Sequence, residues 1–197
     1  MTDIIRKLKN IVTSYHNNIE ALKTEAANFQ RDYANVYLPD VFTSKLSEIT
    51  AKKDAAIRDG NTAIKAAVDA FLDEIKDIDA LDGTRLNEGD MKLLESGIAL
   101  SQNDLEIMFD HARADKNRTM QQIILRRSQR DGITICRLYY TTAEIVEGVR
   151  LMENYAVSAL TSDTYFNMIW SDERINRVIP APLLDLYNLE PRYRYEG

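Results

Sequence analysis

The side chains best suited to catalysis or metal binding are few in this chain, which has two histidines and one cysteine among 197 residues. Neither His16 nor His111 belongs to an H-x-x-x-H or E-x-x-H pattern, the spacings that place two metal ligands on one face of a helix. We therefore expect His16 to face solvent beside an apolar helix stripe and His111 to lie on a helix surface. Cys136, which follows Ile135, is typical of a small core residue.

The sequence "DIDALDG", residues 77–83, is the nearest approach to an ion-binding loop. Leu81 stands where a calcium loop needs its third acidic ligand, and the distal glutamate is missing, so an acidic solvated turn is the better interpretation. The chain has no phosphate-binding glycine-rich loop, no G-x-S-x-G, and no pattern that pairs the cysteine with a base. The sequence thus predicts a protein that is not an enzyme and that has neither a metal site nor a cofactor.

Several arginines gather in the sequence "NRTMQQIILRRSQRDG", residues 117–132. A basic helix can bind an anionic partner, but this one lacks a helix-turn-helix pattern and interleaved aromatic residues. Packing explains it as well, because Arg127 can pair with Asp131 one turn later and cations near a helix C-terminus complement the helix dipole. We favour a packing helix or a protein contact over nucleic acid. The candidate partner or anion contacts are Arg118, Arg126, Arg127 and Arg130.

Charge and hydropathy narrow the class of protein. A net charge of −6 and a pI of about 5.1 argue against general attraction to nucleic acid or to an anionic membrane. No apolar run approaches the roughly 18 residues that a membrane span needs, and the N-terminus lacks the apolar core of a signal peptide. The single cysteine leaves no internal disulfide framework. We expect a cytoplasmic protein without a membrane partner.

The elements that position these residues begin with a heptad repeat at the N-terminus. Apolar residues recur at two positions over about five heptads, more than the three or four that support a coiled-coil prediction. An ordinary bundle helix would carry the same residue types, but its stripe would drift at a 3.6-residue period. We expect an arm over residues 3–37 that joins copies of the chain. The predicted oligomerisation seam consists of Ile5, Leu8, Val12, Tyr15, Ile19, Leu22, Phe29 and Tyr33.

The sequence "YLPDVF" interrupts this arm, because Pro39 removes a backbone donor and disfavours helical angles at Leu38. A second apolar helix follows over residues 40–78, with a weaker seam near Gly60 and Asn61. The simplest arrangement is an antiparallel hairpin that turns at Pro39, in which the seam can be used within the chain. The competing arrangement is one long kinked helix that pairs with another subunit.

Beyond a polar connector the heptads stop and the predicted helices shorten. Ser101 and Thr141, each followed three residues later by an acidic residue, predict capping boxes at the start of two helices. A further helix should begin at Ser162 or Asp163 and end at Pro180 and Pro182. The sequence "ITICRLYY" favours a strand, but a lone strand would have no partner. The predicted fold is all-α, with a coiled-coil helical hairpin over residues 1–79 and a compact bundle of short helices over residues 80–197.

The sequence "LSQNDLEIMFDHARADKNRTMQQIILRRSQRDG", after a long heptad-bearing region, resembles helical proteins encoded in the structural-gene clusters of phages and prophages of Gram-positive bacteria. The resemblance rests on a Leu-Ser cap, here Leu100 and Ser101, and on an Asn-x-Thr-Met core, here Asn117, Thr119 and Met120. It covers about a third of the chain. The resemblance implies a role in virion assembly or in the particle itself, and it brings no active site.

We therefore expect a non-enzymatic phage structural or assembly protein, acting in head morphogenesis or associated with the capsid. Its location would be the host cytoplasm or the virion, and its partners would be copies of itself and other virion or host proteins. The alternative is a small phage-encoded regulatory or inhibitory protein that binds a host protein. An acidic helical protein without catalytic residues fits both on physical grounds, and the resemblance favours the first.

Overall fold

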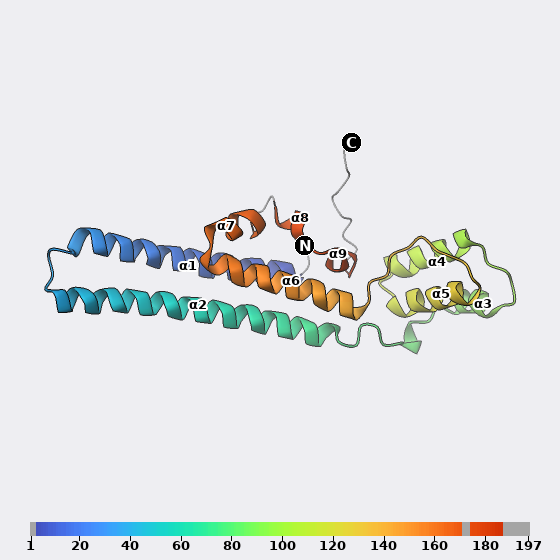
Figure 1. Ribbon diagram of the computed structural model, residues 1–197. Coiled ribbons are helices and arrows are strands. Elements are labelled where there is room, and N and C mark those ends of the chain that lie inside the picture. Colours follow the sequence, from blue (N-terminus) through green and yellow to red (C-terminus); the bar gives the residue numbers. More distant parts are fainter. Residues whose placement is uncertain (1–2, 171–173, 187–197) are drawn as a thin grey trace, which may run out of the picture.

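The computed structural model describes residues 3–170 and 174–186, and every regular element within them is helical. The longest are α1 (Asp3–Tyr33) and α2 (Pro39–Ile75), which run antiparallel along each other (Figure 1). The predicted all-α class and the N-terminal hairpin are therefore confirmed, and the single kinked helix does not form. Within this described part, no helix combines the length and the hydropathy that crossing a membrane would require.

The hairpin turn lies immediately before Pro39, as predicted. Leu38 has extended angles, φ −61° and ψ 143°, and Pro39 occupies the first turn of α2, where its missing N–H costs no helical hydrogen bond. The amides of Val36 and Tyr37 donate to the carbonyl of Tyr33, at N···O distances of 3.1 and 3.4 Å. These bonds close α1 about one turn before the predicted end.

A third long helix, α6 (Thr142–Thr161), packs along both hairpin helices and completes the larger of two hydrophobic cores. It lies beside the half of the hairpin that is away from the turn (Figure 1). The apolar stripe that two helices alone would leave in water is covered there by the third. Fully buried side chains of this hairpin core include Ile5, Leu8, Val12, Ile19, Ile64, Val68, Ile145, Val149, Met152 and Leu160.

A second, smaller core lies at the end of the molecule opposite the hairpin turn (Figure 1). The polar connector around residue 80 lies between the two cores. The residues after it do not share one core, since α6 and the helices that follow pack on the hairpin. The elements around the smaller core are η1 (Gly83–Arg85), α3 (Glu88–Glu95), α4 (Gln102–Ala114) and α5 (Arg118–Arg130).

The helix ends follow the local sequence signals. Ser101 and Thr141 each form the predicted capping box with the acidic residue three positions later. Asn117 caps α5 with its side-chain oxygen, and Gly132 just beyond α5 has a φ of +66°, which glycine adopts without strain. Residues 133–140 connect α5 to α6 without regular structure, so the strand considered for them does not form.

The C-terminal part differs from the single helix predicted between Ser162 and Pro180. It is divided by a π-helical turn, and Pro182 lies in the first turn of a further helix, where proline is tolerated. The buried Trp170 anchors the turn, since its indole N–H donates to the carbonyl of Tyr155 at 3.2 Å. The elements are α7 (Asp163–Tyr165), η2 (Phe166–Trp170), α8 (Ile175–Val178) and α9 (Ala181–Leu186).

Gly60 of α2 lies where α2 meets Tyr15 of α1 and Leu160 of α6. A Cβ atom at this position would lie 3.0 Å from a methyl carbon of Leu160 and 3.1 Å from the ring of Tyr15. The heptad pattern presents Gly60 as a gap in the seam. In the structure, the absence of a side chain there is what gives Leu160 and Tyr15 their space.

We expect Gly60→Val to lower the free energy of unfolding by about 2 kcal/mol, because the added carbons need space that Leu160 and Tyr15 fill. Urea unfolding followed by circular dichroism measures the loss. Ala66→Val, at an exposed position of the same helix, is the matched control and should cost less than about 1 kcal/mol. Equal losses in the two variants would contradict close packing at Gly60.

Candidate functional site

The predicted seam changes character along α1. Its first half is fully buried against α2 and α6, with Ile5, Leu8, Val12 and Ile19 at 0% exposure. Tyr15 and Leu22 are half-buried against the same core. Further along α1, Phe29 is half-buried and Tyr33 is 42% exposed. The seam thus packs inside the chain near the N-terminus and opens toward the hairpin turn.

The far end of the hairpin, residues 29–42, is here called the hairpin tip. No residue between Ile19 of α1 and Ile49 of α2 is buried. Within the tip, the ring of Phe29 lies 5.2 Å from that of Phe42, 5.4 Å from that of Tyr33 and 5.9 Å from that of Tyr37, between centroids. These contacts hold the two helices together without covering them.

The hairpin tip carries an exposed apolar surface of low charge. Its charged residues are Arg31, Asp32 and Asp40, of which Arg31 and Asp32 pair with each other at 2.8 Å. Contiguous apolar surface rimmed by polar residues is typical of a protein contact. The exposed apolar side chains are Tyr33 (42%), Val36 (68%), Tyr37 (40%), Leu38 (74%) and Val41 (42%).

The four candidate arginines of α5 do not share one surface. Arg127 is buried at 8% exposure, and its guanidinium group donates to Asp131 and to the carbonyl groups of Leu94, Ser96 and Ile98. Leu94 lies in the last turn of α3, where carbonyl groups lack intrahelical donors, and Ser96 and Ile98 follow that helix. Arg127 therefore joins α5 to the end of α3.

Arg118 is also committed within the chain. Its guanidinium group donates to a carboxylate oxygen of Asp79 at 2.6 and 3.0 Å and to the carbonyl of Tyr140 at 2.6 Å, and it lies 4.5 Å from the ring centre of Tyr139. Arg126 and Arg130 are exposed, and Arg130 contacts Asp131 at 3.1 Å. Two of the four candidates thus remain open to a partner.

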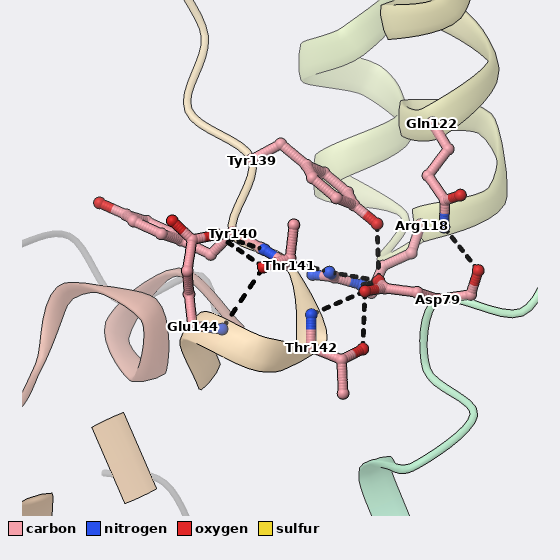
Figure 2. A network of polar contacts seen from close by, with 8 residues as sticks. All are labelled: Asp79, Arg118, Gln122, Tyr139, Tyr140, Thr141, Thr142 and Glu144. Carbon is pink, nitrogen blue, oxygen red and sulfur yellow. Dashed lines mark hydrogen bonds and ion pairs between the residues drawn. The ribbon is translucent and has the colours of Figure 1, made fainter. Parts of the chain in front are cut away.

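Asp79 is the centre of a polar junction between the two cores (Figure 2). Its carboxylate binds Arg118 and also accepts a hydrogen bond from the hydroxyl of Tyr139 at 2.6 Å. Thr142 donates two more, from its backbone amide at 2.7 Å and from its hydroxyl at 2.6 Å. The backbone carbonyl of Asp79 accepts from the side chain of Gln122 at 2.8 Å. Asp79, four residues beyond the end of α2, therefore holds the start of α5 and the start of α6.

The protonation of this junction follows from its contacts. Partial burial would raise the pKa of Asp79, but the bonds from Thr142, Tyr139 and Arg118 outweigh it and lower the pKa to about 2. Burial and the bond to Asp79 raise the pKa of Tyr139 to about 12. A carboxylate this acidic is a poor general base near neutral pH, and its oxygens are occupied. The junction is built to hold elements together.

A cavity of about 340 Å³ adjoins the junction. Its lining mixes the acids Asp77 and Asp82 with cationic side chains that include Arg85 and Lys116. Arg85 lies 3.5 Å from Asp82, so part of this charge is balanced within the chain. Among the residues that the structure describes, those that line this cavity include no cysteine, histidine or serine that could serve as a nucleophile with its base.

Of the two histidines and the cysteine, two lie where the sequence did not predict them. His111 is exposed on α4, as predicted. Cys136 is exposed, so its assignment to a core is wrong; it lies in the irregular segment, where its amide donates to Glu106 at 2.8 Å. His16 is buried at 5% exposure, so the prediction that it faces solvent is also wrong. Together with Glu20 and Asp163 it forms a group that can hold a metal ion.

The junction was not recognised in the sequence, which assigned Asp79 to a solvated acidic turn. The bonds from Tyr139 and Thr142 reach Asp79 across 60 and 63 residues. No motif spacing reports such a contact. The local signal available was the capping box at Thr141, which fixes where α6 begins but not what its first turn contacts.

No protein-family model matches this chain, and neither does any curated protein or solved structure.

We expect Asp79→Asn to lower the free energy of unfolding by about 2 kcal/mol, because Arg118 would lose its carboxylate partner in a partly buried place. Chemical denaturation near neutral pH measures the change. Asp77→Asn is the matched control, since Asp77 is exposed two residues earlier, and it should cost less than about 0.5 kcal/mol. A loss no greater than that of the control would contradict the role assigned to Asp79.

The stabilities of the wild type and of Asp79→Asn should depend differently on pH. The pKa of Asp79 is lower in the folded protein, at about 2, than its ordinary value of 3.8, so its contribution to stability is complete above about pH 4 and is lost as the pH falls through about 2. We expect the stability gap between wild type and Asp79→Asn to shrink from about pH 5 to about pH 2. Urea midpoints at three pH values measure it. A gap that stays constant over this range would contradict the low pKa.

Proposed function

We propose that this protein is a non-enzymatic assembly protein that self-associates through its hairpin tip, of the phage structural kind that the sequence resemblance implies. The observation that carries the proposal is the exposed apolar surface of the tip, with Leu38 74% and Val36 68% exposed. Association with a second protein surface removes such an apolar surface from water and thereby lowers the free energy.

The position of the seam supports the tip, rather than the whole of α1, as the contact. Leu8, Val12 and Ile19 are fully buried against α2 and α6 and have no surface left for another chain. Two copies can place their tips together about a two-fold axis, so that the same patch serves on both sides. The low charge of the tip adds little repulsion to such a contact.

A second candidate function is a monomeric regulatory or inhibitory protein that binds a host protein. Burial of the first half of the seam within one chain favours it, because a single chain already covers most of its own apolar residues. Under this alternative, the hairpin tip would contact a different protein.

Light scattering coupled to size-exclusion chromatography, over a tenfold range of concentration, separates the two functions. We expect the wild-type mass to exceed 22.6 kDa and to rise with concentration. The double variant Val36→Asp/Leu38→Asp should weaken self-association by at least about tenfold, because each of the two substitutions places a charge in the contact.

Leu138→Asp is the matched control, since Leu138 is 65% exposed in the segment between α5 and α6, away from the tip, and its mass profile should equal that of the wild type. A wild-type mass of 22.6 kDa at every concentration would overturn self-association and favour the monomeric alternative. Association that survives in the tip variant would assign the contact to another surface.

A further inference from the structure

His16 lies in an enclosed position between α1, α6 and α7. Its side chain is 6% exposed, with Nδ1 2.9 Å from the carbonyl oxygen of Ala159 and Nε2 3.1 Å from a carboxylate oxygen of Asp163. The ring of Phe166 stacks on the imidazole at 4.1 Å with an angle of 3° between the planes. The imidazole is therefore held in one orientation from both its edges and one face.

These partners determine which atom of the ring carries a proton. A carbonyl oxygen can only accept, so Nδ1 must donate to Ala159. In the neutral ring, Nε2 then presents a lone pair to the Asp163 carboxylate, which also only accepts. Two acceptors at 3.1 Å need a cation between them. That cation is either a proton on Nε2 or a metal ion.

A third ligand distinguishes these cations. Glu20 lies one helical turn after His16 on α1, and one ligand atom from each of His16, Glu20 and Asp163 lies within 4.8 Å of the others. A proton shared by His16 and Asp163 makes no use of Glu20, whereas a metal ion takes three or more ligands. Lys23 holds one Glu20 oxygen at 2.5 Å and also donates to the carbonyl of Thr161, which leaves Glu20 its second oxygen.

We propose that His16, Glu20 and Asp163 bind a divalent transition-metal ion such as Zn²⁺. One imidazole nitrogen with two carboxylate oxygens is a ligand set that suits such ions. Bonds of about 2.0–2.2 Å in tetrahedral geometry place ligand atoms roughly 3.3 Å apart, which the 3.1 Å between Nε2 and Asp163 already approaches. The bond from Nδ1 to Ala159 is the outer contact that commonly fixes a metal-binding histidine.

The proposed ion would join distant parts of the chain. His16 and Glu20 belong to α1, whereas Asp163 begins α7, just after α6. Metal binding would therefore hold the C-terminal helices on the hairpin core and stabilise the fold. This inference is independent of the hairpin tip, which begins at Phe29, beyond Glu20 on α1.

The test uses the full chain with Cys136→Ser, which removes an exposed thiol that can bind Zn²⁺ by itself. Isothermal titration calorimetry with ZnCl₂ should give one ion per chain. At a hundredfold excess of Zn²⁺ over Kd, we expect the melting temperature to rise by about 5 °C or more. Visible absorption of bound Co²⁺ gives a second readout, which reports the ligand geometry directly.

Asp163→Asn and Glu20→Gln should each weaken Zn²⁺ binding at least about tenfold, because each removes a charged ligand. Both side chains are at least partly exposed, at 63% and 31%, so these variants should fold. His111→Gln is the matched control, since it removes the exposed histidine on α4 and should leave binding unchanged. Absence of one-to-one binding, or equal binding by the Asp163→Asn and control variants, would overturn the proposal and leave a proton between His16 and Asp163.

Discussion

The packing of α6 into the groove between α1 and α2 is the contact on which the rest of the structure depends. A hairpin of two helices buries only the line where they touch, so the apolar residues beside that line need a third element. Three regions far apart in the sequence meet at Gly60, where the ring of Tyr15 and the methyl groups of Leu160 fill the space that a side chain would take. The buried half of the seam exists because this third helix is present.

Asp79 anchors the start of that third helix. From its position four residues beyond the end of α2, the carboxylate holds the first turn of α6 through Thr142 and the first turn of α5 through Arg118. Between α2 and α6 the chain makes an excursion of more than sixty residues into the smaller core and then returns to the place it left. The low pKa of Asp79 and the high pKa of Tyr139 are consequences of this return, because both groups are partly buried and bonded to each other.

Local patterns predicted the fold where the physics is local. Pro39 located the hairpin turn, and the capping boxes at Ser101 and Thr141 located two helix starts, since each acts within a few residues. Contacts between distant residues were missed. His16 was predicted to face solvent because no residue near it in the sequence indicates its contact with Asp163. Cys136 was predicted to lie in a core because its apolar neighbours do not reveal that the segment runs over the surface.

The same packing explains why the hairpin tip is open. At about 1.5 Å per residue, the 37 residues of α2 extend roughly 55 Å, whereas the 20 residues of α6 extend roughly 30 Å. The third helix therefore covers little more than half of the hairpin, and the uncovered part is the region between Ile19 and Ile49 where no residue is buried. The contact between the rings of Phe29 and Phe42 joins the two helices there, and the exposed apolar side chains, from Tyr33 to Val41, lie around the turn. In the self-association that we propose, a second hairpin tip would cover this surface without adding any new element to the fold.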